Sequence, residues 1–186
     1  SRAITPKLTA MFLISALHKA QGSENEKTII EFVEKLCIHL ESDSQQHGEL
    51  QSFLLHELLN YHVAQVNIPA AKATFIALAT KQLCTDVTPF NTLLELYANA
   101  CFKCAEHRYL EFKKNNTDRE LPPPTPEEVE KNKEIELLNT TDWYQESLRI
   151  VQHLTDSSIP LSQATYRHLL KSLWYSDKVT PEKMAV

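Results

Sequence analysis

Apolar residues recur every three or four positions along most of the chain, which is the spacing of an amphipathic helix. The first such series contains Leu8, Met11, Phe12, Ile14 and Leu17. Gly22 separates it from a second series that ends at Leu40. Together the two series predict an antiparallel pair of helices, a helical hairpin, over about residues 5–40.

The same pattern predicts three further hairpins, over about residues 49–83, 88–114 and 142–175. Pro69 and Pro89 stand where the first turn of a helix is expected, and proline is favoured there because that turn needs no backbone N–H donor. No strand is needed anywhere to account for the pattern.

The last hairpin has a cap residue before each of its helices. Asp142 and Ser162 have side chains that accept hydrogen bonds from the free N–H groups of a first helical turn. The apolar residues expected in its second helix are Tyr166, Leu169, Leu170, Leu173 and Trp174.

A polar segment interrupts the series over about residues 115–126 and carries three consecutive prolines. Such a composition is typical of an exposed loop. A charged helix is expected next, over residues 126–139, because Thr125 is suited to cap it and acidic residues follow in its first turn.

The helices that begin near residues 8, 50, 88 and 163 are spaced by about 42, 38 and 75 residues, and the last spacing is close to two units of about 37. A recurring unit of about 40 residues is typical of helical repeats, which stack into solenoids. Only two glycines occur, too few for the tight turns of a sheet protein of this size. We therefore predict an all-α fold, an α-solenoid of helix hairpins forming one helical-repeat domain over residues 1–186, and we expect it to be a fragment of a longer protein.

Charge and composition narrow the range of functions. The net charge of −5 argues against a polyanion-binding surface, because affinity for phosphate chains comes from lysine and arginine. Two glycines cannot form a glycine-rich phosphate loop, and no apolar run approaches the ~20 residues that span a bilayer. Three of the four cysteines lie within apolar helical patterns and Cys84 lies at a helix end, which suggests reduced thiols in an intracellular compartment. We expect no membrane partner, small-molecule substrate or cofactor.

Three segments of the chain resemble the pentatricopeptide repeat, a family of helical hairpins related in shape to the tetratricopeptide repeat. The first, VTPFNTLLELYANACFKCAEHRYLEFKK, resembles the opening of the repeat and its amphipathic second helix. LTAMFLISALHKAQG is similar to the first helix and turn of the repeat, and IPLSQATYRHLLKSLW to the turn between repeats and the next first helix.

This resemblance implies an α-solenoid, and in the family often a protein that reads single-stranded RNA one base per repeat, commonly in mitochondria. The base-reading position of the family corresponds to Asn91 in one unit and to Arg167 in the last. In the first unit it corresponds to Met11 or Phe12, whose side chains cannot hydrogen-bond a base. The resemblance therefore supports the shape more than it supports RNA binding.

An alternative interpretation of the third hairpin is that it contains a metal or redox site. Cys101 and Cys104 form a Cys-x-x-Cys pair, and His107 follows three residues later. On a helix these three side chains drift around the cylinder, and zinc motifs usually contain two such pairs rather than one. We therefore expect the thiols to pack in a seam between helices.

Aromatic and basic residues supply the candidate contacts to partners. Arg108, Tyr109, Lys113 and Lys114 form one basic and aromatic cluster that could meet a phosphate chain, although a solvated helix end has the same composition. Trp143 and Trp174 are expected to anchor the core or the contacts between repeats. Either tryptophan, if exposed, becomes a candidate contact for a protein partner.

These observations favour a non-catalytic helical-repeat scaffold that mediates binding within a protein or ribonucleoprotein assembly. If the repeat resemblance holds, its role would lie in mitochondrial RNA metabolism or translation; otherwise we expect a cytoplasmic protein. The first alternative is a pentatricopeptide protein that binds single-stranded RNA. The second is a small α-helical metal or redox site at Cys101 and Cys104.

Overall fold

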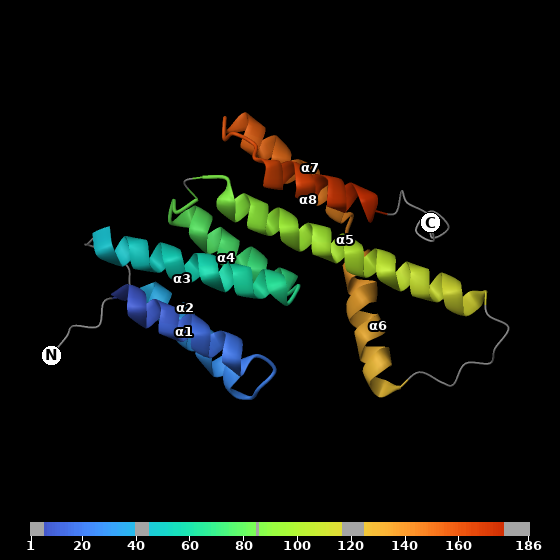
Figure 1. The fold of residues 1–186 in the computed structure, drawn as a ribbon, viewed down its shortest axis with the longest axis horizontal. Helices are drawn as coiled ribbons and strands as arrows, with labels where there is room; N and C mark the ends of the chain where they lie inside the picture. The colour runs from blue at the N-terminus through green and yellow to red at the C-terminus, as the bar shows by residue number, and fades with distance from the viewer. Residues whose placement is uncertain (1–5, 40–44, 85, 117–124, 177–186) are drawn as a thin grey trace. The chain divides into compact units, whose positions relative to one another are not determined.

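The structure is a computed structural model that describes residues 6–39, 45–84, 86–116 and 125–176. Every regular element in these ranges is an α-helix, which confirms the all-α fold class. The helices are α1 (Pro6–Ala20), α2 (Asn25–His39), α3 (Gln45–Ala64), α4 (Ile68–Thr80), α5 (Thr88–Asn115), α6 (Pro126–Asn139), α7 (Trp143–Asp156) and α8 (Gln163–Trp174) (Figure 1).

Six of these helices coincide with three of the predicted pairs: α1 packs on α2, α3 on α4, and α7 on α8. The charged helix α6 also has the predicted bounds, whereas most of the proline-rich segment before it lies outside the described residues. The two predicted caps of the last pair are confirmed. The side chain of Asp142 accepts from the backbone N–H of Gln145 at 3.1 Å, and that of Ser162 from Thr165 at 3.2 Å.

The hairpin predicted over residues 88–114 is wrong, because the structure has one continuous 28-residue helix there, α5. Its middle contains Ala98, Ala100 and Ala105, and alanine has the highest helix propensity of all residues. Neither glycine nor proline occurs between Pro89 and Asn115, so the segment lacks the two strongest helix-breaking residues.

Three of the helices end without glycine. Val66, Gln82 and Ser158 follow α3, α4 and α7 with φ values of 54°, 55° and 57°, in the left-handed region. In each case the next residue donates its backbone N–H to the carbonyl five residues earlier, as in Asn67 to His62 at 2.9 Å, the bond that defines a Schellman motif. The chain therefore turns between helices with few glycines, at some cost in backbone strain.

The chain forms two compact units, residues 1–92 and 93–186, and the boundary falls inside α5. In the first unit α3 packs on α4 and also on α1 and α2. The largest buried side chains of this unit are Leu17, Val33, Leu54, Leu58, Leu59, Tyr61 and Leu78. The Tyr61 hydroxyl donates to the Glu26 carboxylate at 2.7 Å, which ties α3 to the start of α2.

One part of the apolar series predicted for the first helix faces solvent. Ile14 and Leu17 are buried, but Leu8, Met11 and Phe12 are more than half exposed. At about 100° per residue, these two groups lie on different sides of α1. Because α1 packs on its neighbours through the Ile14 side, the other side is left open.

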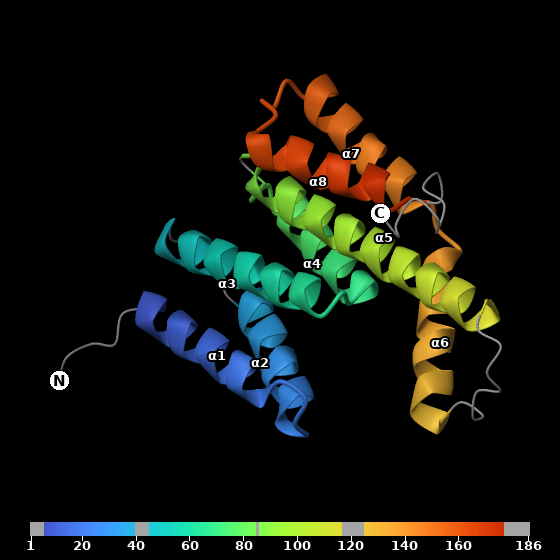
Figure 2. The ribbon, with the colours of Figure 1, turned by 45° about the vertical axis from the view of Figure 1, so that its right-hand side comes forward.

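The second unit contains the rest of α5 with α6, α7 and α8, and α7 and α8 lie side by side in both views (Figures 1 and 2). Tyr97 of α5 packs against Trp143 of α7 with ring centroids 5.4 Å apart. Lys171 of α8 donates to the side chain of Asn99 at 2.9 Å. Contacts along three helices therefore hold α5, α7 and α8 together, while the serial stacking of hairpins into a solenoid stays a prediction.

Candidate functional site

Helix α8 has its polar side inside and its apolar side outside. Its most buried side chains are Thr165, His168 and Ser172, spaced three and four residues apart on one face. Four large apolar residues of the same helix are exposed on the other face, while Leu169 is half-buried beside Thr165. This arrangement is the reverse of a helix that packs through its apolar stripe.

Hydrogen bonds satisfy the buried polar face. The Ser172 hydroxyl donates to the carbonyl of His168 at 3.0 Å and lies 3.2 Å from the hydroxyl of Ser147 on α7. Ser147 in turn donates to the carbonyl of Trp143 at 2.9 Å. Small hydroxyl side chains allow the two helices to approach closely, and each buried hydroxyl has a partner, so this face is a stable packing surface.

Burial also affects the histidine on this face. It lowers the pKa of His168, since the charged ring would lose solvation. The carboxylate of Glu95 opposes this shift, and the nearby cations Arg167 and Lys171 add to it. The structure therefore favours the neutral ring between α8 and its neighbours.

The outward face of α8 consists of Tyr166, Leu170, Leu173 and Trp174, which we call the α8 apolar surface. Leu170 is 64% exposed and Trp174 is 62% exposed. Residues separated by three, four, seven and eight positions share a face of a helix, so the four side chains form one stripe along α8. Contiguous apolar surface of this kind is typical of binding sites on soluble proteins.

The two tryptophans have different environments. Trp143 is buried at the start of α7, where its ring Nε1 donates to the carbonyl of Leu138 at 2.8 Å. This places it in the core. Trp174 lies mostly in solvent, so it meets the condition under which we expected a tryptophan to contact a partner.

Cations border the α8 apolar surface on one side. Arg167 and Lys171, four residues apart and both exposed, follow the flank of the stripe next to Trp174. From Gln163 to Trp174 the helix has no acidic residue, although the whole chain has a net charge of −5. The surface is therefore apolar with a locally basic edge.

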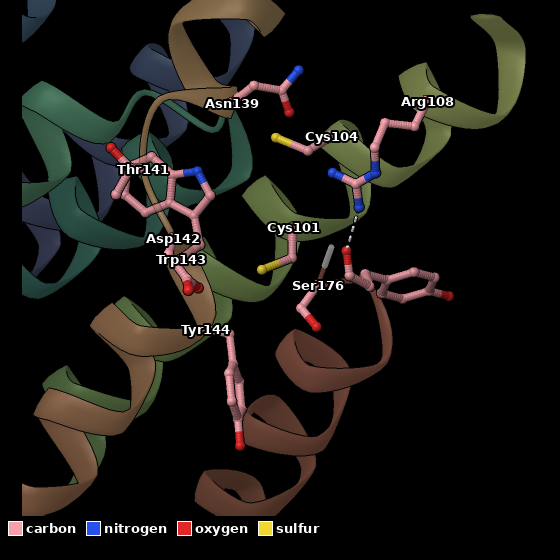
Figure 3. Close-up of a pocket in the computed structure, with 10 residues that line it drawn as sticks. Cys101, Cys104, Arg108, Asn139, Thr141, Asp142, Trp143, Tyr144 and Ser176 are labelled. Atoms are coloured by element: carbon pink, nitrogen blue, oxygen red, sulfur yellow. Dashed lines mark hydrogen bonds between the residues drawn. The ribbon is translucent and has the colours of Figure 1, made fainter. Parts of the chain in front are cut away.

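Cys101 and Cys104 lie beside a small cavity of about 20 Å³, which has room for about one water molecule. Both thiols are buried on α5, with their sulfur atoms directed toward the turn between α6 and α7 (Figure 3). The guanidinium of Arg108 borders the same cavity and donates to the carbonyl of Tyr175 at 3.0 Å. His107 is not among the lining residues.

Within the described parts of the chain, no three or more His, Cys, Asp or Glu side chains converge to hold a metal ion. Cys101 and Cys104 share this position with packed side chains such as Trp143. The arrangement resembles a packed seam between helices more than an open ligand site, since buried thiols behave as small apolar groups.

The predicted RNA-contacting residues point in several directions on the elements that carry them. Arg108 is directed to the end of α8, while Lys114 pairs with Glu111 at 3.3 Å. Arg108 and Lys113 lie about 140° apart around α5, so they do not share a face. Tyr109 is half-buried and lies near the Lys113 side. Asn91 belongs to the first compact unit and Arg167 to α8 of the second.

No family model, curated protein or solved structure matches this chain. None of the helices in the described ranges is both long enough and apolar enough to span a bilayer. Function must therefore be argued from the surfaces themselves.

The sequence identified Trp174 as a candidate contact. It did not show that Tyr166 and Leu170 would be exposed beside it. The sequence does contain a sign of a second, polar face, because Thr165, His168 and Ser172 are spaced as regularly as the apolar residues of the same helix. Periodicity shows that α8 has two faces. Only the packing against α7 shows which of them is buried.

Proposed function

We propose that this chain is a non-catalytic helical scaffold that binds a protein partner through the α8 apolar surface. The observation that carries the proposal is the inverted polarity of α8. Ser172 on the buried face contacts Ser147 of α7, while the stripe points away from this contact and stays exposed. Exposing Leu170 and Trp174 to water is unfavourable, and a partner that covers them removes that cost.

The composition of the surface suits this role. Tryptophan and tyrosine are enriched among the residues that contribute most to protein binding, and Trp174 and Tyr166 are both more than half exposed. Helical scaffolds commonly present such surfaces within larger assemblies. We place the chain in a protein or ribonucleoprotein assembly, and the pentatricopeptide resemblance suggests mitochondrial RNA metabolism or translation as its setting.

Site-specific photocrosslinking tests the proposal. A benzophenone amino acid replaces Trp174 in the full chain, and in a matched control it replaces Ile76, an apolar residue of α4 that is also 62% exposed. After irradiation in cell extract, we expect one or a few proteins attached at position 174 that are not attached at position 76. RNase treatment before irradiation shows whether RNA mediates the contact.

Two results would contradict the proposal. Equal crosslinking at positions 174 and 76 would mean that the α8 apolar surface has no preferred protein partner. Attachment of nucleic acid alone would favour the RNA-binding alternative. Adding the Leu170→Glu substitution provides a second control, because a charge at the centre of the stripe should abolish specific crosslinking at position 174 without altering the buried face of α8.

A further inference from the structure

We infer that the occupant of the α8 apolar surface is an amphipathic helix of a partner protein, with acidic residues along the edge that meets Arg167 and Lys171. This inference rests on the proposed function, and it adds the chemistry of the partner. Two features support it: the apolar stripe and the exposed cations Arg167 and Lys171 beside it.

The shape of the stripe fits a helix. Tyr166, Leu170, Leu173 and Trp174 follow one line along α8, and a 12-residue helix is about 18 Å long. A partner helix with apolar residues at three- and four-residue intervals can pack its ridge into the groove beside such a row. Helix-in-groove recognition uses the same spacing of anchor residues.

The charges beside the stripe indicate what kind of partner helix would bind there. Lys171 donates one hydrogen bond to Asn99, and an ammonium group has three N–H donors, so it can also meet an outside carboxylate. The side chain of Arg167 is exposed on the same flank. Helix α8 itself has no acidic residue, although Glu95 of α5 acts on the neighbouring His168, and carboxylates from a partner would add to the matching negative charge.

A second copy of this chain fits less well. In a two-fold pair of antiparallel helices, each flank faces the same flank of the other copy. Arg167 and Lys171 would then oppose identical cations, and no acidic residue of α8 lies near to offset the repulsion. Charge complementarity therefore favours a different protein.

Selection from a displayed peptide library tests the inference. The library is a phage-displayed amphipathic helix, with a fixed leucine stripe and randomised positions on both of its flanks, selected against the full 186-residue chain. We expect selected peptides to be enriched in Asp and Glu on one flank and to bind the Leu170→Glu variant at least about tenfold more weakly.

Charge reversal provides the matched control. In the Arg167→Glu, Lys171→Glu double variant the apolar stripe is intact, so selected peptides should shift from acidic to basic flanks. Acidic peptides should bind this variant about tenfold more weakly than wild type, and the difference should shrink as salt rises. Circular dichroism of each variant verifies that the helices are retained.

The outcomes separate the inference from the proposed function. Absence of selected peptides, or peptides without acidic enrichment, overturns the inference, even if photocrosslinking at position 174 still finds a protein. Sedimentation that shows a dimer dependent on Leu170 would assign the surface to a second copy. Binding to vesicles of phosphatidylcholine and phosphatidylserine, with no acidic peptide selected, would assign it to lipid. Both results overturn the inference.

Discussion

The hydroxyl of Ser147 on α7 lies 3.2 Å from the hydroxyl of Ser172 on α8, inside the contact between the two helices. This pair defines the inward face of α8. It places Leu170 and Trp174 on the outward face, and the account of function depends on that orientation.

In an ordinary amphipathic helix, substituting the apolar residues lowers stability most. In α8 we expect substitutions of the buried polar residues to lower it most instead. Ser172→Leu introduces a large side chain where two helices are closely packed, and should lower the free energy of unfolding by about 1–3 kcal/mol. Leu170→Ser, on the exposed face, should change it by less than about 0.5 kcal/mol. Urea denaturation monitored by circular dichroism measures both. A larger loss for Leu170→Ser than for Ser172→Leu would mean that α8 packs through its apolar side.

Stability should fall as the pH drops from about 7 to 5. Burial lowers the pKa of both His62 and His168, although Glu26 opposes the shift at His62 and Glu95 opposes it at His168. Below the pKa of unfolded histidine, about 6.5, the unfolded chain takes up protons that the folded chain does not. The free energy of unfolding should then decrease by at most about 1.4 kcal/mol per pH unit for each histidine.

The control for this pH effect is His62→Phe. Within the described residues, Nε2 of His62 is buried without a hydrogen-bond partner, so phenylalanine removes a titrating group and keeps a planar ring. Its unfolding free energy should depend less on pH between 7 and 5 than that of wild type. The pKa of Glu26 is lowered by the Tyr61 hydroxyl, so this carboxylate affects stability only near and below pH 4.5, outside the window. An unchanged pH dependence in His62→Phe would contradict the assignment to His62.

The continuity of α5 can be tested with proline. Lys103 lies exposed in the middle of this helix, where a hairpin would have required a turn. In a continuous helix Lys103→Pro removes a backbone hydrogen bond and introduces a steric clash, which should cost about 3 kcal/mol or more. Lys103→Ala should be close to neutral. Thermal unfolding of the two variants compares them, and equal melting temperatures would favour a turn near residue 103.

The cysteines should differ in their reactivity toward a thiol reagent. Cys84 is partly exposed, whereas Cys37, Cys101 and Cys104 are buried; burial raises the pKa of Cys37 to about 11 and also raises that of Cys84, so access to the sulfur is what separates them. Because the thiolate is the reactive form, the folded chain should label first at Cys84 and at the other three positions only on unfolding. Peptide mapping after brief labelling identifies the site. Rapid labelling of Cys101 and Cys104 would instead support the redox alternative.

The sequence predicted most of the helices because amphipathic periodicity and caps are local signals. Asp142 and Ser162 start α7 and α8 as expected, since capping depends on residues within three positions. The predicted hairpin over residues 88–114 followed the repeat spacing, whereas the segment contains neither glycine nor proline after Pro89 and forms the single helix α5. In this segment, local composition alone predicts one continuous helix.

The orientation of α8 could not be predicted in the same way. Its two faces have the same period, and hydrophobicity alone would bury Leu170 rather than Ser172. The choice is made by contacts between elements that are 25 residues apart in sequence, such as Ser147 with Ser172. Trp143 and Trp174 show the same limit of sequence-based prediction, because both are tryptophans but one is buried and the other is exposed.

The most direct test of the account is acrylamide quenching of Trp174 fluorescence in the Trp143→Phe chain, alone and with the protein identified by crosslinking at position 174. The account predicts that Trp174 is readily quenched in the free chain and becomes protected, with a blue-shifted emission, when that partner is added. Protection of Trp174 in the free chain, or equal quenching in the complex, would contradict the claim that this exposed face of α8 is the binding surface.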